Sequence, residues 1–139
     1  MKLDLSSFKK AVKSLEQAIE ISNKLIKGAN TPEEKFFKAG VIQNFEFTYE
    51  LSWKIIQRCI ELYFNPGIEV VTRRDLFRMA FKYNLIEDPK DWYEYQQNRN
   101  ITSHAYDELK ADAVYQIAKI FIEDAKYLLA KLEEVNNEQ

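Results

Sequence analysis

Apolar residues recur in the first part of the chain at intervals of three, four and seven positions. They are Leu5, Phe8, Val12, Leu15, Ile19 and Ile26. Because an α-helix turns once in about 3.6 residues, these side chains share one face, and the pattern predicts an amphipathic helix that ends at Gly28-Ala29-Asn30. A similar stripe near the other end predicts the last helix. Its members are Val114, Ile117, Phe121, Leu128, Leu132 and Val135.

The longest apolar region predicts a central helix from about Pro32 to Phe64. It begins with a capping box, Thr31-Pro32-Glu33-Glu34, in which Thr and Glu side chains bind free backbone N–H groups and Pro takes the first helical position. Between Val41 and Tyr63 apolar residues occupy nearly every face, as in a helix surrounded by others. The break Asn65-Pro66-Gly67 should end this helix, and a short extended connector follows at 68–71.

Capping residues predict three helices in the second half of the chain. The expected starts are Thr72-Arg73-Arg74-Asp75, Asp88-Pro89-Lys90-Asp91 and Asp107. Asn84 suits the left-handed conformation that would end the first of them at about Tyr83. The predicted fold is therefore all-α, an antiparallel up-and-down four-helix bundle with one additional short helix. It should form a single domain over residues 1–135, followed by a C-terminal tail at 136–139 that frays.

Composition narrows the classes of function. The 139 residues include only three Gly and three Pro, which supports long regular elements. The net charge of −2 means that any nucleic-acid binding would need a local basic patch or a partner. The single cysteine, Cys59, lies in an apolar run and should be buried; no disulfide, metal site or cofactor is predicted. No signal peptide and no uncharged stretch of about 20 residues is present, so we expect a cytoplasmic protein without membrane association.

The only histidine lies in the densest group of reactive side chains. The segment reads Arg99-Asn100-Ile101-Thr102-Ser103-His104-Ala105-Tyr106, or R-x4-H-x-Y. Arginine can bind an anionic phosphate, histidine can transfer protons near neutral pH, and tyrosine carries a nucleophilic hydroxyl. This set suits metal-independent cleavage of RNA, in which a ribose 2′-hydroxyl attacks the adjacent phosphorus. His104 would transfer a proton and Arg99 would stabilise the extra negative charge.

Arg99 and His104 do not share a face of a regular helix, because they are about 140° apart around it. Asn100 does share a face with His104 and could orient the imidazole. For Arg99 and His104 to converge, the helix must end or kink here, which Thr102 and Ser103 favour, or a second chain must complete the site. A symmetric dimer would bring two histidines to one cleft. The alternative is a polar helix end, with His104 hydrogen-bonded within the bundle and Arg99 in an ion pair.

Two long blocks of the sequence resemble one protein family. The first, at 43–54, is Gln43-Asn44-Phe45-Glu46-Phe47-Thr48-Tyr49-Glu50-Leu51-Ser52-Trp53-Lys54, and it is similar to an F-E-x-T-x-E-L-x-W-K pattern. The second runs from Arg99 to Asp107 and is similar to R-N-x-T-S-H-x-Y-D. Both patterns are typical of nucleotidyltransferase substrate-binding proteins, a branch of the HEPN domains. That group includes the toxin component of toxin–antitoxin pairs with a minimal nucleotidyltransferase (MNT). The resemblance covers most of the chain.

The resemblance implies a four-helix bundle, a homodimer and a separately encoded MNT-type nucleotidyltransferase as partner. In the toxin branch the arginine and histidine act in RNA cleavage, and the motif tyrosine accepts AMP from the partner, which silences the toxin. The corresponding residues are Arg99, His104 and Tyr106. The alternative is a non-catalytic subunit that binds a nucleotide or other substrate for the transferase. A third interpretation is a purely structural helical adaptor. The chain lacks the Gly-Ser pair and Asp-x-Asp motif of a transferase, so it is not the transferase itself.

Three further groups of side chains have two interpretations each. A polar strip on the second helix is either a solvated face or a surface toward the site, where Glu46 or Glu50 would pair with Arg99 and support it. The strip comprises Gln43, Glu46, Glu50, Lys54 and Gln57. A basic patch, with Arg73 adjacent, is either ordinary surface charge or a binding site for RNA or nucleotide phosphates. It comprises Arg74, Arg78 and Lys82. Aromatic residues either fill the core or stack on bases. These are Phe45, Phe47, Tyr49, Trp53 and Trp92.

Overall fold

The computed structural model describes residues 2–69, 72–102 and 107–139. Over these residues the chain is all-α, with no strand, as the sequence predicts. The α-helices are α1 (Ser6–Leu25), α2 (Pro32–Cys59), α3 (Arg73–Lys82), α4 (Pro89–Thr102) and α5 (Glu108–Asn137), and α2 continues into the π-helical turn η1 (Ile60–Phe64).

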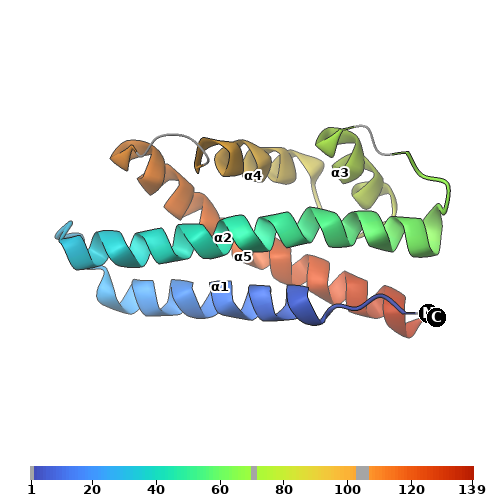
Figure 1. Cartoon of the computed structure of the whole chain (residues 1–139), viewed down its shortest axis with the longest axis horizontal. Coiled ribbons are helices and arrows are strands. Elements are labelled where there is room, and N and C mark those ends of the chain that lie inside the picture. The colour runs from blue at the N-terminus through green and yellow to red at the C-terminus, as the bar shows by residue number, and fades with distance from the viewer. Residues whose placement is uncertain (1, 70–71, 103–106) are drawn as a thin grey trace.

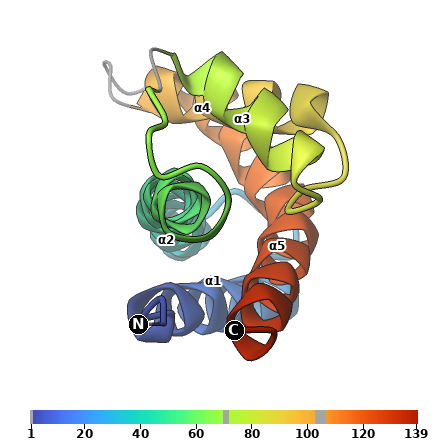
Figure 2. The same ribbon diagram turned by 90° about the vertical axis from the view of Figure 1, so that its right-hand side faces the viewer.

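The helices form a bundle around α2 and α5. Helices α1 and α2 run antiparallel and side by side, and α5 packs against both while crossing them at an angle (Figure 1). Seen end-on, α3 and α4 lie over α2 and α5 on the side away from α1 (Figure 2). Both termini lie at the same end of the bundle (Figure 1), where the backbone of Leu3 bonds the side chain of Asn136. The bundle therefore surrounds α2 with packed helices on two sides, as its apolar sequence predicts.

Side-chain caps begin the helices where the sequence predicts them. The Thr31 hydroxyl accepts a hydrogen bond of 3.2 Å from the N–H of Glu34, and the Glu34 carboxylate accepts one of 3.2 Å from the N–H of Asn30. The expected capping box is therefore present, with the return bond to the residue before the cap. Thr72 and Asp107 likewise cap α3 and α5.

The ends of the helices agree with prediction at two places and differ at one. Asn84 has φ 63°, the left-handed conformation expected after α3. Helix formation extends to Phe64 as predicted, although its last turn is π-helical. The helix α5 runs through Asn136 and Asn137, two residues that the sequence assigns to a frayed tail. The reason is a tertiary contact: the Asn136 side chain bonds both the N–H and the C=O of Leu3 and accepts from the Tyr63 hydroxyl at 2.6 Å.

An aromatic cluster joins the helices. The ring of Phe121 on α5 lies 4.9 Å from Tyr95, 5.2 Å from Phe45 and 5.5 Å from Trp92, in edge-to-face arrangements that aromatic quadrupoles favour. All four rings are buried. Since Trp92 and Tyr95 belong to α4, the cluster fixes the helix that leads into the R-x4-H-x-Y segment against α2 and α5.

Candidate functional site

Hydrogen bonds hold α4 from both sides. The hydroxyl of Tyr95 donates to the carboxylate of Asp124 on α5, and burial raises the pKa of both groups. Toward α2, the hydroxyl of Tyr49 donates to the side-chain carbonyl of Gln96, and burial raises the pKa of Tyr49. The Gln96 amide in turn donates to Asn100 at 3.4 Å. The last two turns of α4 are thus connected to buried groups of both neighbouring helices.

Arg99 lies on the last turn of α4 and forms ion pairs with two carboxylates of α2. Its Nη1 lies 3.6 Å from Glu46 Oε2, and its Nε lies 3.3 Å from Glu50 Oε1. Glu46 and Glu50 are four residues apart and therefore share a face of α2. The second oxygen of Glu50 accepts a hydrogen bond of 3.0 Å from the indole of Trp53. The arrangement orients the guanidinium and surrounds one positive charge with two negative ones.

His104 and Tyr106 lie outside the described residues, and so does Ser103. The predicted roles of His104 as proton carrier, Tyr106 as AMP acceptor and Asn100 as a support for the imidazole therefore stay predictions. The helix α4 ends at Thr102, between Arg99 and His104. Since the described part of the chain stops at Thr102 before His104, the convergence of Arg99 and His104 also stays a prediction.

The three members of the predicted basic patch make different contacts. Arg78 lies 3.9 Å from Asp75 and is largely exposed, and Lys82 lies over the ring of Tyr83. Arg74 instead lies over the ring of Tyr93, with its guanidinium carbon 4.6 Å from the ring centroid.

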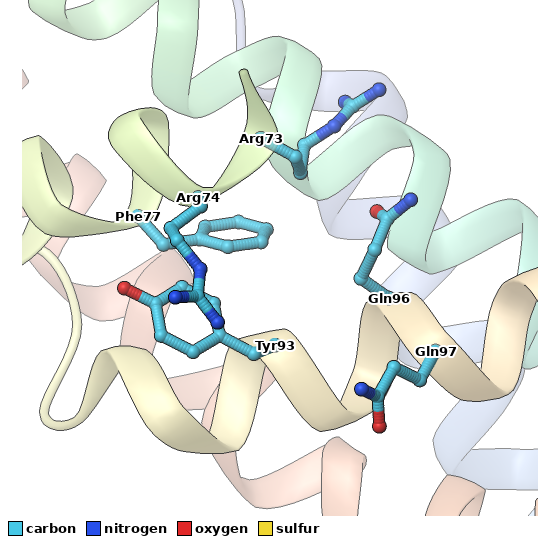
Figure 3. Close-up of a pocket in the computed structure, with 6 residues that line it drawn as sticks. All are labelled: Arg73, Arg74, Phe77, Tyr93, Gln96 and Gln97. Atoms are coloured by element: carbon cyan, nitrogen blue, oxygen red, sulfur yellow. The ribbon is translucent and has the colours of Figure 1, made fainter.

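Arg74 lines a pocket of about 180 Å³ between α3 and α4 (Figure 3). The lining residues are Arg73, Arg74, Phe77, Tyr93, Gln96 and Gln97. The sequence indicates Arg73 only as a neighbour of the patch. Because Thr72 caps α3, Arg73 is its first residue, and its guanidinium carbon lies 3.4 Å from the centre of the Trp53 ring. No periodicity in the sequence indicates this contact.

The polar strip of α2 also divides. Glu46 and Glu50 face Arg99, whereas Gln43 is exposed, Lys54 lies near the Trp53 ring and Gln57 bonds Glu61. Glu46 and Glu50 therefore fit the interpretation as a surface toward the site, and the other three residues fit the interpretation as a solvated face.

The aromatic residues of the matched blocks also take different positions. Phe45, Tyr49 and Trp92 are buried in the core. Trp53 is half-buried beneath Arg73, and Phe47 is 60% exposed. Of the five candidates for stacking on bases, only these two therefore retain accessible surface.

The described residues offer no support for several other kinds of site. No group of three or more His, Cys, Asp or Glu side chains there is placed to hold a metal ion. None of the described helices is long and apolar enough to cross a membrane. Cys59 is fully buried, and burial raises the pKa of its thiol to about 11, which makes it a packing residue rather than a nucleophile.

Comparisons with known proteins agree in sequence and in fold. The family described as "Nucleotidyltransferase substrate binding protein like" matches residues 3–134. The probable ribonuclease HepT of Haemophilus influenzae is 40% identical over 100 residues, which cover 70% of this chain and 68% of that protein.

Two solved structures have the same fold. One is a Haemophilus influenzae protein described as revealing the fold of a substrate binding domain of a nucleotidyltransferase. It superposes with a TM-score of 0.85 at 34% identity and covers 94% of this chain and 99% of its own. The other, from Thermus thermophilus, superposes with a TM-score of 0.67 at 24% identity over 88% of this chain and 98% of its own, and supports the fold alone.

Proposed function

Because the chain belongs to the nucleotidyltransferase substrate-binding protein family, we propose that it is a toxin-type, metal-independent ribonuclease whose partner is a separately encoded nucleotidyltransferase. The observation that carries the proposal is the position of Arg99. It lies on the last turn of α4, is held by Glu46 and Glu50, and is followed within a few residues by His104. The relative named as a probable ribonuclease supports RNA cleavage as the activity.

In the proposed reaction the ribose 2′-oxygen forms a bond to phosphorus while the bond to the 5′-oxygen of the next nucleotide breaks. The products are a 2′,3′-cyclic phosphate and a free 5′-hydroxyl. His104 takes the proton from the 2′-hydroxyl, and a second proton carrier delivers one to the leaving oxygen. Arg99 stabilises the additional negative charge on the phosphoryl oxygens. A homodimer would supply the second carrier as the partner's copy of the same histidine.

The cleavage test compares the protein with two variants on single-stranded RNA in the presence of a chelator. His104→Ala should lower the rate by about 10²–10⁴-fold, since a positioned proton carrier contributes that much. Arg99→Lys should also be severely impaired, because a compact ammonium replaces a planar fork. Lys13→Ala, an exposed change on α1, serves as the matched control. Full activity of His104→Ala would exclude this mechanism.

We further propose that the partner silences the chain by transferring AMP to Tyr106. The adduct would place a bulky anion close in sequence to Arg99, where it would compete with the RNA phosphate. Incubation with the transferase, ATP and magnesium should raise the mass by one or more AMP units, and Tyr106→Phe should block the gain. Tyr115 is a suitable internal control, because it is buried with its hydroxyl 3.1 Å from Ser22. An adduct on Tyr115 would contradict the assignment.

The proposed homodimer has a candidate surface on α2. Phe36 is 76% exposed and Phe47 is 60% exposed, and their spacing places both on one face of the helix. Exposed apolar side chains at helical spacing favour burial against a second helix. Phe47→Glu should shift the mass measured by light scattering from dimer to monomer, whereas Ile120→Glu, an exposed position on α5, should not. A monomeric wild-type protein would exclude the composite site.

A second candidate function is a non-catalytic subunit that binds a nucleotide or other substrate for the transferase. The specific observation in its favour is that Glu46 and Glu50 both pair with Arg99, which partly neutralises the guanidinium that RNA cleavage would need. The Haemophilus structure described as a substrate binding domain is consistent with it. This function predicts that the chain changes the KM of the transferase for its substrate and leaves RNA intact.

A further inference from the structure

The pocket between α3 and α4 is connected to the candidate site by two routes. Gln96, which lines the pocket, is bonded to Asn100 and lies one turn before Arg99 on α4. Trp53, on which Arg73 stacks, donates its indole N–H to the Glu50 carboxylate that also pairs with Arg99. The pocket and the motif arginine therefore occupy neighbouring positions on one surface formed by α2, α3 and α4.

Arg73 has unused hydrogen-bonding capacity. Its Nη1 is buried and has no hydrogen-bond partner among the described residues. Burial lowers its pKa, while the nearby Tyr49 and Glu50 act in the opposite direction. A buried donor without a partner is destabilising, so this guanidinium is held at the pocket by its stacking on Trp53 rather than by hydrogen bonds from Nη1.

Arg74 is held at the opposite side of the pocket. Figure 3 shows its guanidinium lying across the face of Tyr93, whereas the Gln97 side chain points away from both arginines. Stacking on an aromatic ring leaves the edge of a guanidinium, which carries its N–H donors, free to bind a phosphate. Within the described residues neither Arg73 nor Arg74 has an ion-pair partner within 4 Å.

The charges differ between the two parts of this surface. Among the described residues, two carboxylates pair with the one guanidinium of Arg99, so the charge that these three groups present to an approaching phosphate is negative. Arg73 and Arg74 add two positive charges beside it. The volume of about 180 Å³ is below the ~300 Å³ at which pockets for drug-sized ligands begin, so it suits a phosphate group better than a whole nucleotide.

We propose that Arg73 and Arg74, whose guanidinium groups point in opposite directions (Figure 3), each bind a separate backbone phosphate of the RNA strand whose cleaved phosphodiester lies at Arg99. This inference rests on the proposed ribonuclease function. The two arginines would provide the affinity for the strand, and the Gln96 amide, which lies on the side of Arg73, would be a further donor to the phosphate at Arg73 (Figure 3). The motif arginine is then reserved for the charge that develops during cleavage.

The test measures binding of a short fluorescent single-stranded RNA by anisotropy in a His104→Ala background, over a range of potassium chloride concentrations. Arg73→Gln and Arg74→Gln should each weaken binding by about tenfold, as expected for loss of one charge-assisted hydrogen bond. Each should also lower the slope of log affinity against log salt by about 0.7, the value for one contact to a single strand. Arg58→Gln is the matched control, because Arg58 is exposed on α2 and its charge acts on Asp4 beside α1.

Two further arms separate loss of RNA binding from misfolding and from mononucleotide binding. Arg73→Lys keeps the charge but loses the planar group that stacks on Trp53, so its salt slope should match the parent although its affinity falls; this variant is used where Arg73→Gln does not fold. AMP replaces RNA in a second titration: variants that lose AMP binding but keep RNA affinity would identify a mononucleotide site and overturn the proposal. RNA affinity equal to wild type in both Gln variants, or no RNA affinity in the parent, would also overturn it.

Cleavage is measured separately with His104 intact. If the protein cleaves RNA but neither Gln variant weakens RNA binding, only the proposed phosphate-binding role of the pocket is refuted. If RNA binding depends on both arginines but the protein does not cleave RNA, only the proposed ribonuclease function is refuted.

Discussion

Replacing Glu50 by Gln isolates the charge of one carboxylate at the candidate site. The Gln side chain has nearly the same shape and keeps a carbonyl oxygen that can accept from Arg99 or from the Trp53 indole. The ion pair at 3.3 Å becomes a contact between the charged guanidinium and a neutral amide, while Glu46 continues to pair with Arg99 at 3.6 Å. The variant should therefore unfold more easily and bind RNA more tightly than the wild type.

The expected loss in the free energy of unfolding of Glu50→Gln follows from the distance between the two charges and from their exposure to solvent. At 3.3 Å two unit charges attract by about 1.3 kcal/mol at the dielectric constant of water and by about 5 kcal/mol at an effective value of ~20. The side chains of Arg99 and Glu50 are 25% and 36% exposed, so solvent screens the pair, and desolvation and side-chain ordering offset much of the attraction. We expect a net loss of about 1 kcal/mol in the free energy of unfolding, which corresponds to a fall of about 3–5 °C in Tm.

Urea unfolding at low and at high salt measures this loss. The difference between Glu50→Gln and wild type should shrink in 1 M salt, where the Debye length is about 3 Å. Glu134→Gln is the matched control, since Glu134 is 61% exposed and pairs with Lys131 at 3.5 Å; its loss should lie near zero. Equal losses in both variants, or a loss at Glu50 that does not depend on salt, would refute the electrostatic reasoning.

Three other variants test single interactions by urea unfolding. Asp107→Ala should cost about 1–2 kcal/mol, because its carboxylate accepts from two N–H groups at the start of α5, at 2.9 and 3.2 Å. Thr31→Ala should cost about 1 kcal/mol through loss of the α2 cap, with Thr31→Ser as the variant that keeps the bond. Burial raises the pKa of Asp124 above 3.8, so its stabilising contribution is complete below that pH and is lost as the pH rises through the folded value. The stability of wild type relative to Asp124→Asn should therefore fall with rising pH; a difference that rises instead would contradict this sign.

Helix boundaries were predictable because the interactions that set them are local. Thr31, Thr72 and Asp107 bind N–H groups two or three residues away, and Asn84 adopts its left-handed conformation next to the helix that it ends. The same holds for the apolar stripes, since their spacing depends only on the geometry of one helix. The extension of α5 through Asn136 was not predictable, because it depends on groups at the other end of the chain.

The candidate site also combines features that the sequence predicts with features that depend on the packing of the helices. The sequence alone identified Arg99 as a cation near a histidine, and Glu46 and Glu50 as a pair on one helix face. Only the packing of α4 against α2 decided that both carboxylates meet the same guanidinium. The stacking of Arg73 on Trp53 likewise follows from the position of α3 across α2.

The physical reason is that the periodicity of a helix specifies which of its residues share a face, but not which face of another helix they will meet. Charge is a property of each residue in the sequence. Its energy depends on distance and on the exclusion of water, and both are determined by the tertiary structure.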